Sequence, residues 1–196
     1  GVEVQRKDTN GTPATAKYTP TVKPVTPTSD DAISEDIQGA KQTGTPLFIP
    51  GNFDVPITIN AAQPAKLIDP ETGKPTDETS VNIPGEGTYT INPNSGEVTF
   101  TPEKDFTGVG GGVTVQVKDA NGTPVEAGYT PKVKGVTPTA TPAKSKDVQG
   151  VKQTGLPEFV GGKVTVNNVE KTVKIDETKA PQLIDPETGE PTDDPV

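Results

Sequence analysis

The residues best suited to chemistry in this chain are the acidic side chains of the segment DPETGKPTDE. The segment brings Asp69, Glu71, Asp77 and Glu78 close together, and carboxylate oxygens are the ligands that Ca²⁺ prefers. The same residue types form ordinary turns, and the similar stretch 8–11, Asp-Thr-Asn-Gly, lacks the complete EF-hand loop pattern. Turn formation is therefore the favoured interpretation, and a calcium-rigidified surface module is the alternative.

Enzymatic chemistry has little support in the composition. The chain contains no His and no Cys, which removes Ser-His and Cys-His nucleophile pairs and the usual zinc sites. Paired carboxylates can hydrolyse glycosides, but they require a rigid cleft and one desolvated acid, and no pair is marked here. We predict that the protein is not an enzyme, and we assign no catalytic, cofactor-binding or metal-binding residue and no cofactor.

A covalent cross-link is a further open alternative. Without Cys, such a link within the chain would be an isopeptide bond between Lys and Asn or Asp. It requires a buried Lys, its acceptor and a neighbouring acid in an apolar pocket, and the sequence alone does not locate these groups.

The composition predicts a folded but thin core. Apolar residues make up 29% and aromatic residues 4%, while 21 Gly and 22 Pro stand among the 196 residues. These values lie near the border at which buried surface no longer offsets conformational entropy, although the apolar residues alternate as strands require. A net charge of −9 disfavours nucleic acid as a partner, and no apolar run is long enough for a membrane helix.

The chain contains an internal repeat. The stretch Gly1–Phe48 returns at Gly112–Phe159 without a gap, and 31 of the 48 aligned positions are identical. A second block, LIDPETGKPTD at Leu67–Asp77, returns as LIDPETGEPTD at Leu183–Asp193. The offset grows from 111 to 116, so five extra residues lie between positions 160 and 182, where the strand register stays open. A fixed period indicates a repeated module rather than a single reaction centre.

The elements of this module are short strands separated by turns. Asn10-Gly11 and its copy Asn121-Gly122 each join two extended runs, and this dipeptide supplies the positive φ angles of a tight hairpin. A second hairpin is predicted in GTYTINPNSGEVTFTP, with Pro93 and Gly96 at the turn, and the segment 69–73 reverses the chain after Leu67–Ile68. Further strand candidates are Ile57–Ile59, Val81–Ile83, Val164–Val166 and Val173–Ile175.

These elements predict an all-β fold. No segment shows the helical period, and β-branched residues and Pro disfavour helix throughout. We predict tandem antiparallel β-sandwich modules of immunoglobulin-like type, joined by Pro/Thr-rich linkers, with the topology left open. The bulky side chains available for the core are Tyr18, Phe48, Phe53, Tyr89, Phe100, Phe106 and Tyr129.

Pro and Thr concentrate at 18–31 and 129–144, and these stretches predict stiff linkers and module boundaries. Three parts follow: the C-terminal hairpin of a preceding repeat at 1–24, one complete module at 25–135, hereafter the central module, and the N-terminal part of a following repeat at 136–196. Neither flank contains a counterpart of residues 78–111. We therefore expect the flanks to be less protected than the central module.

Three phrases in this order are typical of one family: GTYTINPNSGEVTFTPEKDFTG, VTVQVKDANGTPVEAGYTPKV and VQGVKQTG. Together they resemble the CshA-type fibril repeat of cell-wall-anchored fibrillar adhesins of streptococci and related Gram-positive bacteria. The resemblance implies a surface-exposed stalk of β-rich domains, with a distinct binding region at its outer end and a sorting signal at the wall end. Such a stalk helps the cell attach to host surfaces and other bacteria.

We predict a structural stalk repeat whose partners are neighbouring repeats of the same chain and, through other regions of the parent, a host extracellular matrix protein. The alternative is a repeat that itself binds a host matrix protein or glycan, for example by strand addition. The chain starts at Gly1 without Met or a signal peptide, so we expect an internal part of a secreted, wall-anchored protein with no membrane insertion of its own. The thin core predicts modules that unfold at modest force.

Overall fold

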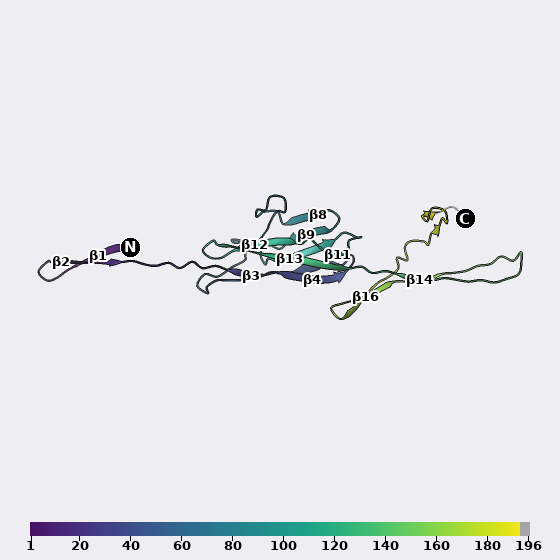
Figure 1. Cartoon of the computed structure of the whole chain (residues 1–196), viewed down its shortest axis with the longest axis horizontal. Helices are drawn as coiled ribbons and strands as arrows, with labels where there is room; N and C mark the ends of the chain where they lie inside the picture. The colour runs from purple at the N-terminus through teal and green to yellow at the C-terminus, as the bar shows by residue number, and fades with distance from the viewer. Residues whose placement is uncertain (193–196) are drawn as a thin grey trace.

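A computed structural model of the chain describes residues 1–192, and every regular element within them is a β-strand. Figure 1 shows an elongated molecule in which one hairpin, a packed central module and a second group of hairpins follow one another. Two sheets face each other in the centre, one antiparallel and one mixed, which confirms the prediction of an all-β sandwich. None of the described residues belongs to a helix that would be long and apolar enough to cross a membrane.

The first sheet of the central module contains the predicted second hairpin. Its order is β5 (Gln42–Gly44), β10 (Val98–Pro102), β9 (Gly87–Ile91) and β8 (Ser80–Ile83), and all neighbours are antiparallel. The β9–β10 turn has Gly96 at a φ of 76°, as the turn sequence requires.

The second sheet joins the beginning and the end of the module. Its antiparallel path is β11 (Gly108–Val109), β13 (Pro124–Lys134), β12 (Val113–Lys118) and β7 (Lys66–Leu67). On the other edge of β13 lies β4 (Ala32–Ile37), and this pair is parallel. The antiparallel pattern of the sequence did not predict it, because a parallel pair joins segments far apart in the chain and leaves no turn signal between them.

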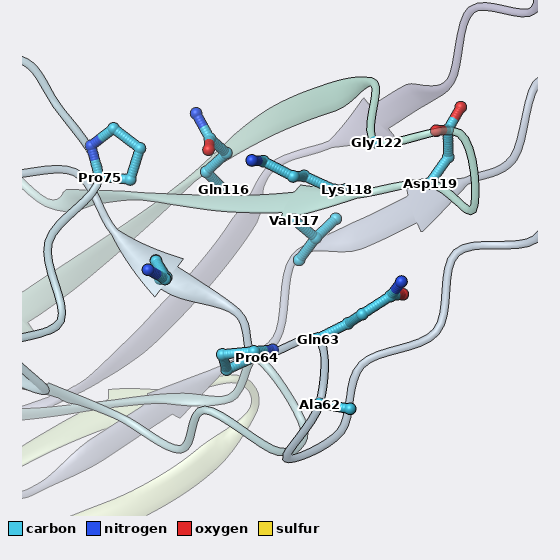
Figure 2. Close-up of a pocket in the computed structure, with 10 residues that line it drawn as sticks. Ala62, Gln63, Pro64, Pro75, Gln116, Val117, Lys118, Asp119 and Gly122 are labelled. Carbon is cyan, nitrogen blue, oxygen red and sulfur yellow. The ribbon is translucent and has the colours of Figure 1, made fainter.

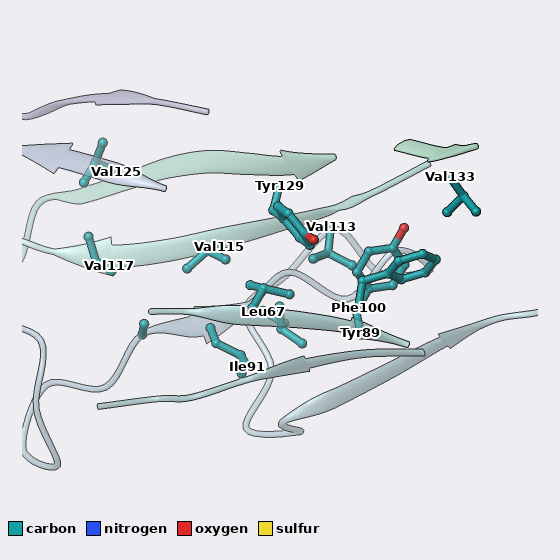
Figure 3. Packing of buried hydrophobic residues seen from close by; sticks show 12 residues of the cluster. Leu67, Tyr89, Ile91, Phe100, Val113, Val115, Val117, Val125, Tyr129 and Val133 are labelled. Carbon is teal, nitrogen blue, oxygen red and sulfur yellow. The ribbon is translucent and has the colours of Figure 1, made fainter. Parts of the chain in front are cut away.

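The core lies between these two sheets (Figure 3). Residues on β9, β10, β12 and β13 alternate between buried and less buried positions, as strands with one face on a core require. The tyrosine and phenylalanine rings pack at one end of the core, where the Tyr89 and Phe100 centroids are 4.6 Å apart and those of Tyr89 and Tyr129 6.3 Å apart. The buried cluster is Ala65, Leu67, Tyr89, Ile91, Val98, Phe100, Val113, Val115, Val117, Val125, Tyr129 and Val133.

The expected aromatic core is correct for five of its seven members. Tyr89, Phe100 and Tyr129 are buried, and Phe48 and Phe106 pack against them from partly buried positions. The prediction was wrong for Tyr18, which is largely exposed because no second sheet covers its hairpin. It was also wrong for Phe53, which is 96% exposed on the turn that follows Gly51.

The flanks consist of isolated two-stranded pairs. At the N-terminal end β1 (Val2–Lys7) pairs with β2 (Pro13–Tyr18) around the predicted Asn10-Gly11 turn. A small pair, β3 (Thr28–Asp30) with β6 (Leu47–Ile49), opens the central module, and β14 (Thr139–Thr141) with β15 (Glu158–Val160) is its copy 111 residues later. The last pairs are β16 (Gly162–Val166) with β17 (Val169–Val173), and β18 (Leu183–Ile184) with β19 (Pro191–Thr192).

Three sequence predictions need correction. No strand forms at Ile57–Ile59, where Ile57 makes only an isolated bridge to Asp119 and both isoleucines cover the core from a turn-rich loop. The candidate Val173–Ile175 contributes only Val173 to a strand, because the Asn167-Asn168 turn fixes a register in which Val173 faces Gly162, the first residue of β16.

The third correction concerns the second linker, predicted at 129–144. Its first six residues, 129–134, complete β13, and residues 139–141 form β14. Pro131 is tolerated inside β13 because only its carbonyl is used, accepting the N–H of Gly110 at 2.9 Å. The predicted C-terminal part, 136–196, and the last residue of the second LIDPETGEPTD block extend beyond the described residues, at 193–196.

Candidate functional site

The acidic segment DPETGKPTDE, which begins at Asp69, forms a turn. Oδ1 of Asp69 accepts the backbone N–H groups of Glu71 and Thr72 at 2.8 and 3.2 Å, and these bonds lower the pKa of Asp69. Asp77 is paired instead with Lys66, Nζ to Oδ1 2.7 Å, and the hydrogen bond and charge of Lys66 lower its pKa. Residues 1–192 contain no group of three or more His, Cys, Asp or Glu side chains arranged to hold a metal ion.

The isopeptide alternative requires a lysine inside an apolar pocket. All lysine side chains in the part of the chain that the structure describes are exposed or half-buried. The buried charged residues there are acids, Glu86 and Asp119. The geometry around the described lysines therefore gives no support to such a bond.

The feature that joins the two ends of the central module is the parallel pair β4–β13. The register runs from Tyr129 opposite Ala32 to Lys134 opposite Ile37, and the N–H of Gln38 extends it by donating to the Lys134 carbonyl at 2.8 Å. Because the two strands are parallel, the chain enters β4 at one end of the pair and leaves β13 at the other (Figure 1). A force that separates the two ends of the module therefore acts along the strands and loads their hydrogen bonds together.

Side chains strengthen this pair from within the sandwich. The Ser34 hydroxyl on β4 donates to Oε1 of Gln42 at 2.6 Å and lies 2.7 Å from the Tyr129 hydroxyl on β13. Nε2 of Gln42, itself buried, donates to the Lys132 carbonyl at 2.9 Å. Buried polar groups that find partners in this way contribute to stability and fix one register. The network therefore connects β4, β5 and β13 at the point where the two sheets meet.

A second buried network connects the sheets on the other side of Tyr89. Its hydroxyl donates to Oε1 of the buried Glu86, and Oε2 of Glu86 accepts the N–H of Gly111 at 2.8 Å. Burial, followed by the hydrogen bond and charge of Glu86, raises the pKa of Tyr89 well above its usual range. A Cβ at Gly110 would stand 2.7 Å from both Glu86 Oε1 and the Tyr89 hydroxyl, so this loop requires glycine.

A shallow pocket lies beside the β12–β13 turn. It has a volume of about 350 Å³, and its wall includes Lys66, Gln116, Lys118 and Asp119 (Figure 2). Oδ1 of Asp119 caps the turn by accepting the N–H groups of Asn121 and Thr123 at 2.9 and 2.8 Å. Oδ1 of this acid is thus a structural part of the hairpin, whereas Oδ2 is buried without a hydrogen-bond partner among the described residues.

Sequence reasoning missed both buried networks. Ser34, Gln42 and Glu86 are common polar residues in short strands and turns, and nothing in their spacing distinguishes them from exposed positions. The available signal was the repeat itself, because Ser34 and Gln42 return as Ser145 and Gln153.

Comparison with known proteins places the central module in a defined sequence group. The family model described as "Surface adhesin CshA repetitive domain" matches residues 24–133. A search of the curated proteins found no match. Among solved structures, the chain is similar to one titled "PcdhgB3 EC1-4 in 50 mM HEPES", with 11% identity and a TM-score of 0.38 over 92% of this chain. This chain covers 57% of that structure's length, and a likeness at this level carries no argument about function.

Proposed function

The chain belongs to the family of repetitive domains of CshA-type surface adhesins, and we propose that it is part of a stalk whose role is mechanical and spatial. As a surface adhesin repeat it acts outside the cell. The stalk projects a distal binding region, which lies in other parts of the parent protein together with the contact to host matrix, and the parent is anchored to the cell wall. The repeat itself catalyses no reaction.

The observation that carries this proposal is the parallel pairing of β4 with β13. A stalk module transmits force from the preceding repeat to the following one, and these two strands are its first and last long strands. When parallel strands are pulled from opposite ends, the hydrogen bonds between all six residue pairs bear the force together. Antiparallel terminal strands are instead pulled apart from one end, so their hydrogen bonds break one after another. The pairing suits a module that is held under tension.

The surface of the chain is consistent with the same role. The net charge of −9 keeps neighbouring stalks apart and soluble, since like charges repel. Pro20 and Pro24 in the linker restrict its backbone, which favours an extended junction between successive modules.

Single-molecule pulling on the chain tests the proposal. We expect one main unfolding event that releases about 100 residues, or roughly 330–360 Å of contour length before the folded length is subtracted. Ser34→Ala, which removes the hydroxyl between Gln42 and Tyr129, should lower the unfolding force, while Ser145→Ala at the copy position should not. A featureless stretching curve, or an equal effect of both substitutions, contradicts the proposal.

A further inference from the structure

The hairpin β16–β17 lies where the second repeat is longer than the first. It lies in the segment that carries the five extra residues, and Asn167 and Asn168 form its turn with φ angles of 48° and 63°. Two successive positive φ angles are typical of the type I′ turn, which suits the twist of a tight hairpin. The corresponding segment of the central module, which starts at Gly51, forms turns and isolated bridges and contains no strand before β7.

Both segments begin from the same anchor. A Cβ at Gly51 would stand 2.3 Å from the Thr26 carbonyl oxygen, and a Cβ at Gly162 would stand 2.5 Å from that of Thr137, the copy of Thr26. The chain therefore leaves the same place in each repeat. What differs is the direction of the residues that follow.

In the second repeat these residues reach back to the central module. Nζ of Lys171 lies 3.2 Å from Oδ2 of Asp36 on β4, and Nζ of Lys134 on β13 donates to the Thr165 carbonyl at 3.0 Å. Between these contacts Val166 is only 2% exposed, although it belongs to an isolated hairpin. Figure 1 shows β16 beside the end of the central module at which β4 and β13 finish.

We propose that the β16–β17 hairpin is a junction clasp that docks on the β4 edge of the preceding module and fixes the orientation of successive repeats. The partner of the hairpin is the preceding repeat of the same chain. The hairpin recognises the acidic edge formed by Glu35 and Asp36, together with Lys134, which also pairs with Glu35 at 3.3 Å. The clasp rests on the stalk proposed above, because it presupposes that repeats follow one another under tension.

The test measures the distance between the central module and the hairpin in the full chain. We introduce the substitutions Thr101→Cys in β10 and Lys174→Cys after β17 as labelling sites. Because the chain has no other Cys, the spin labels attach at these two positions alone. We expect one narrow distance distribution. Lys171→Gln should lower the ratio of docked to undocked hairpin about threefold, and Val166→Ser roughly tenfold. Asp36→Asn should act like Lys171→Gln, and it leaves the hairpin sequence intact.

Lys163→Gln is the matched control. It removes the same charge from the same hairpin, where Lys163 pairs with Glu170 at 3.0 Å and, among the described residues, makes no ion pair with the central module. The distribution should keep its width in this variant. A broad distribution in the unmodified chain, or equal broadening by Lys163→Gln and Lys171→Gln, overturns the clasp. Either result leaves the unfolding event of the central module, which tests the stalk, unaffected.

Discussion

Two hairpins of nearly the same sequence lie in opposite environments in this molecule. The β1–β2 hairpin and the first part of β12–β13 share the phrase NGTP at the turn and follow the same register. Val4 is 60% exposed and Tyr18 64%, whereas their copies Val115 and Tyr129 are fully buried. The difference arises because the second hairpin is covered by the β5–β10–β9–β8 sheet and the first is not.

The turns of the two hairpins show that local geometry does not depend on this environment. Oδ1 of Asp8 accepts the N–H groups of Asn10 and Thr12 at 2.9 and 2.8 Å, and Asp119 makes the same two bonds with the same lengths. Strand pairing is therefore encoded in the hairpin itself. Stability is not, because an isolated two-stranded hairpin is marginal in water without a covered apolar face.

The largest predicted difference between the two hairpins concerns their tyrosines. Tyr129→Ala should lower the free energy of unfolding of the central module by about 3–5 kcal/mol, because it empties a buried aromatic site and removes a partner of Ser34. Tyr18→Ala should change it by less than about 0.5 kcal/mol. Urea unfolding followed by circular dichroism measures both values. Equal costs would show that the N-terminal hairpin belongs to the same cooperative unit.

Alkaline pH should affect the central module through its buried tyrosines. Burial raises the pKa of Tyr89, with a further contribution from Glu86, and burial raises that of Tyr129 despite the opposing hydrogen bond with Ser34. A tyrosine whose pKa is higher in the folded state than in the unfolded state stabilises the fold. This contribution is fully present below the unfolded-state pKa of about 10, and it is lost as the pH rises from there through the folded-state pKa. The urea concentration at the unfolding midpoint should therefore decrease as the pH rises above about 10, and it should decrease less steeply in Tyr89→Phe. The same fall in both proteins would assign the effect to other groups.

The sequence predicted the parts of the fold that are encoded locally. The β9–β10 hairpin follows from alternating residues around a Pro and Gly turn, and the chain reversal at Asp69 follows from a side chain that accepts its own turn's N–H groups. The β4–β13 pair was missed because its strands are about 100 residues apart and Pro131 suggested a linker. Phe53 was placed in the core by residue type, although its turn directs it to solvent.

The candidate site was less predictable than the strands. Family resemblance identified a surface adhesin repeat, but the contacts on which the proposed stalk role rests involve Ser34, Gln42 and Lys171, whose roles depend on the packing of distant segments. The five inserted residues were located by the change in offset, and only the structure shows that this segment forms a hairpin against the preceding module.

Hydrogen exchange on the intact chain tests the account most directly, because both hairpins are measured in one sample. Amides in β12 and β13 should exchange at least about a hundredfold more slowly than the matched amides in β1 and β2, a factor that corresponds to about 3 kcal/mol of opening free energy. Equal protection of the two hairpins would contradict the claim that such a hairpin is stable only as part of the complete sandwich.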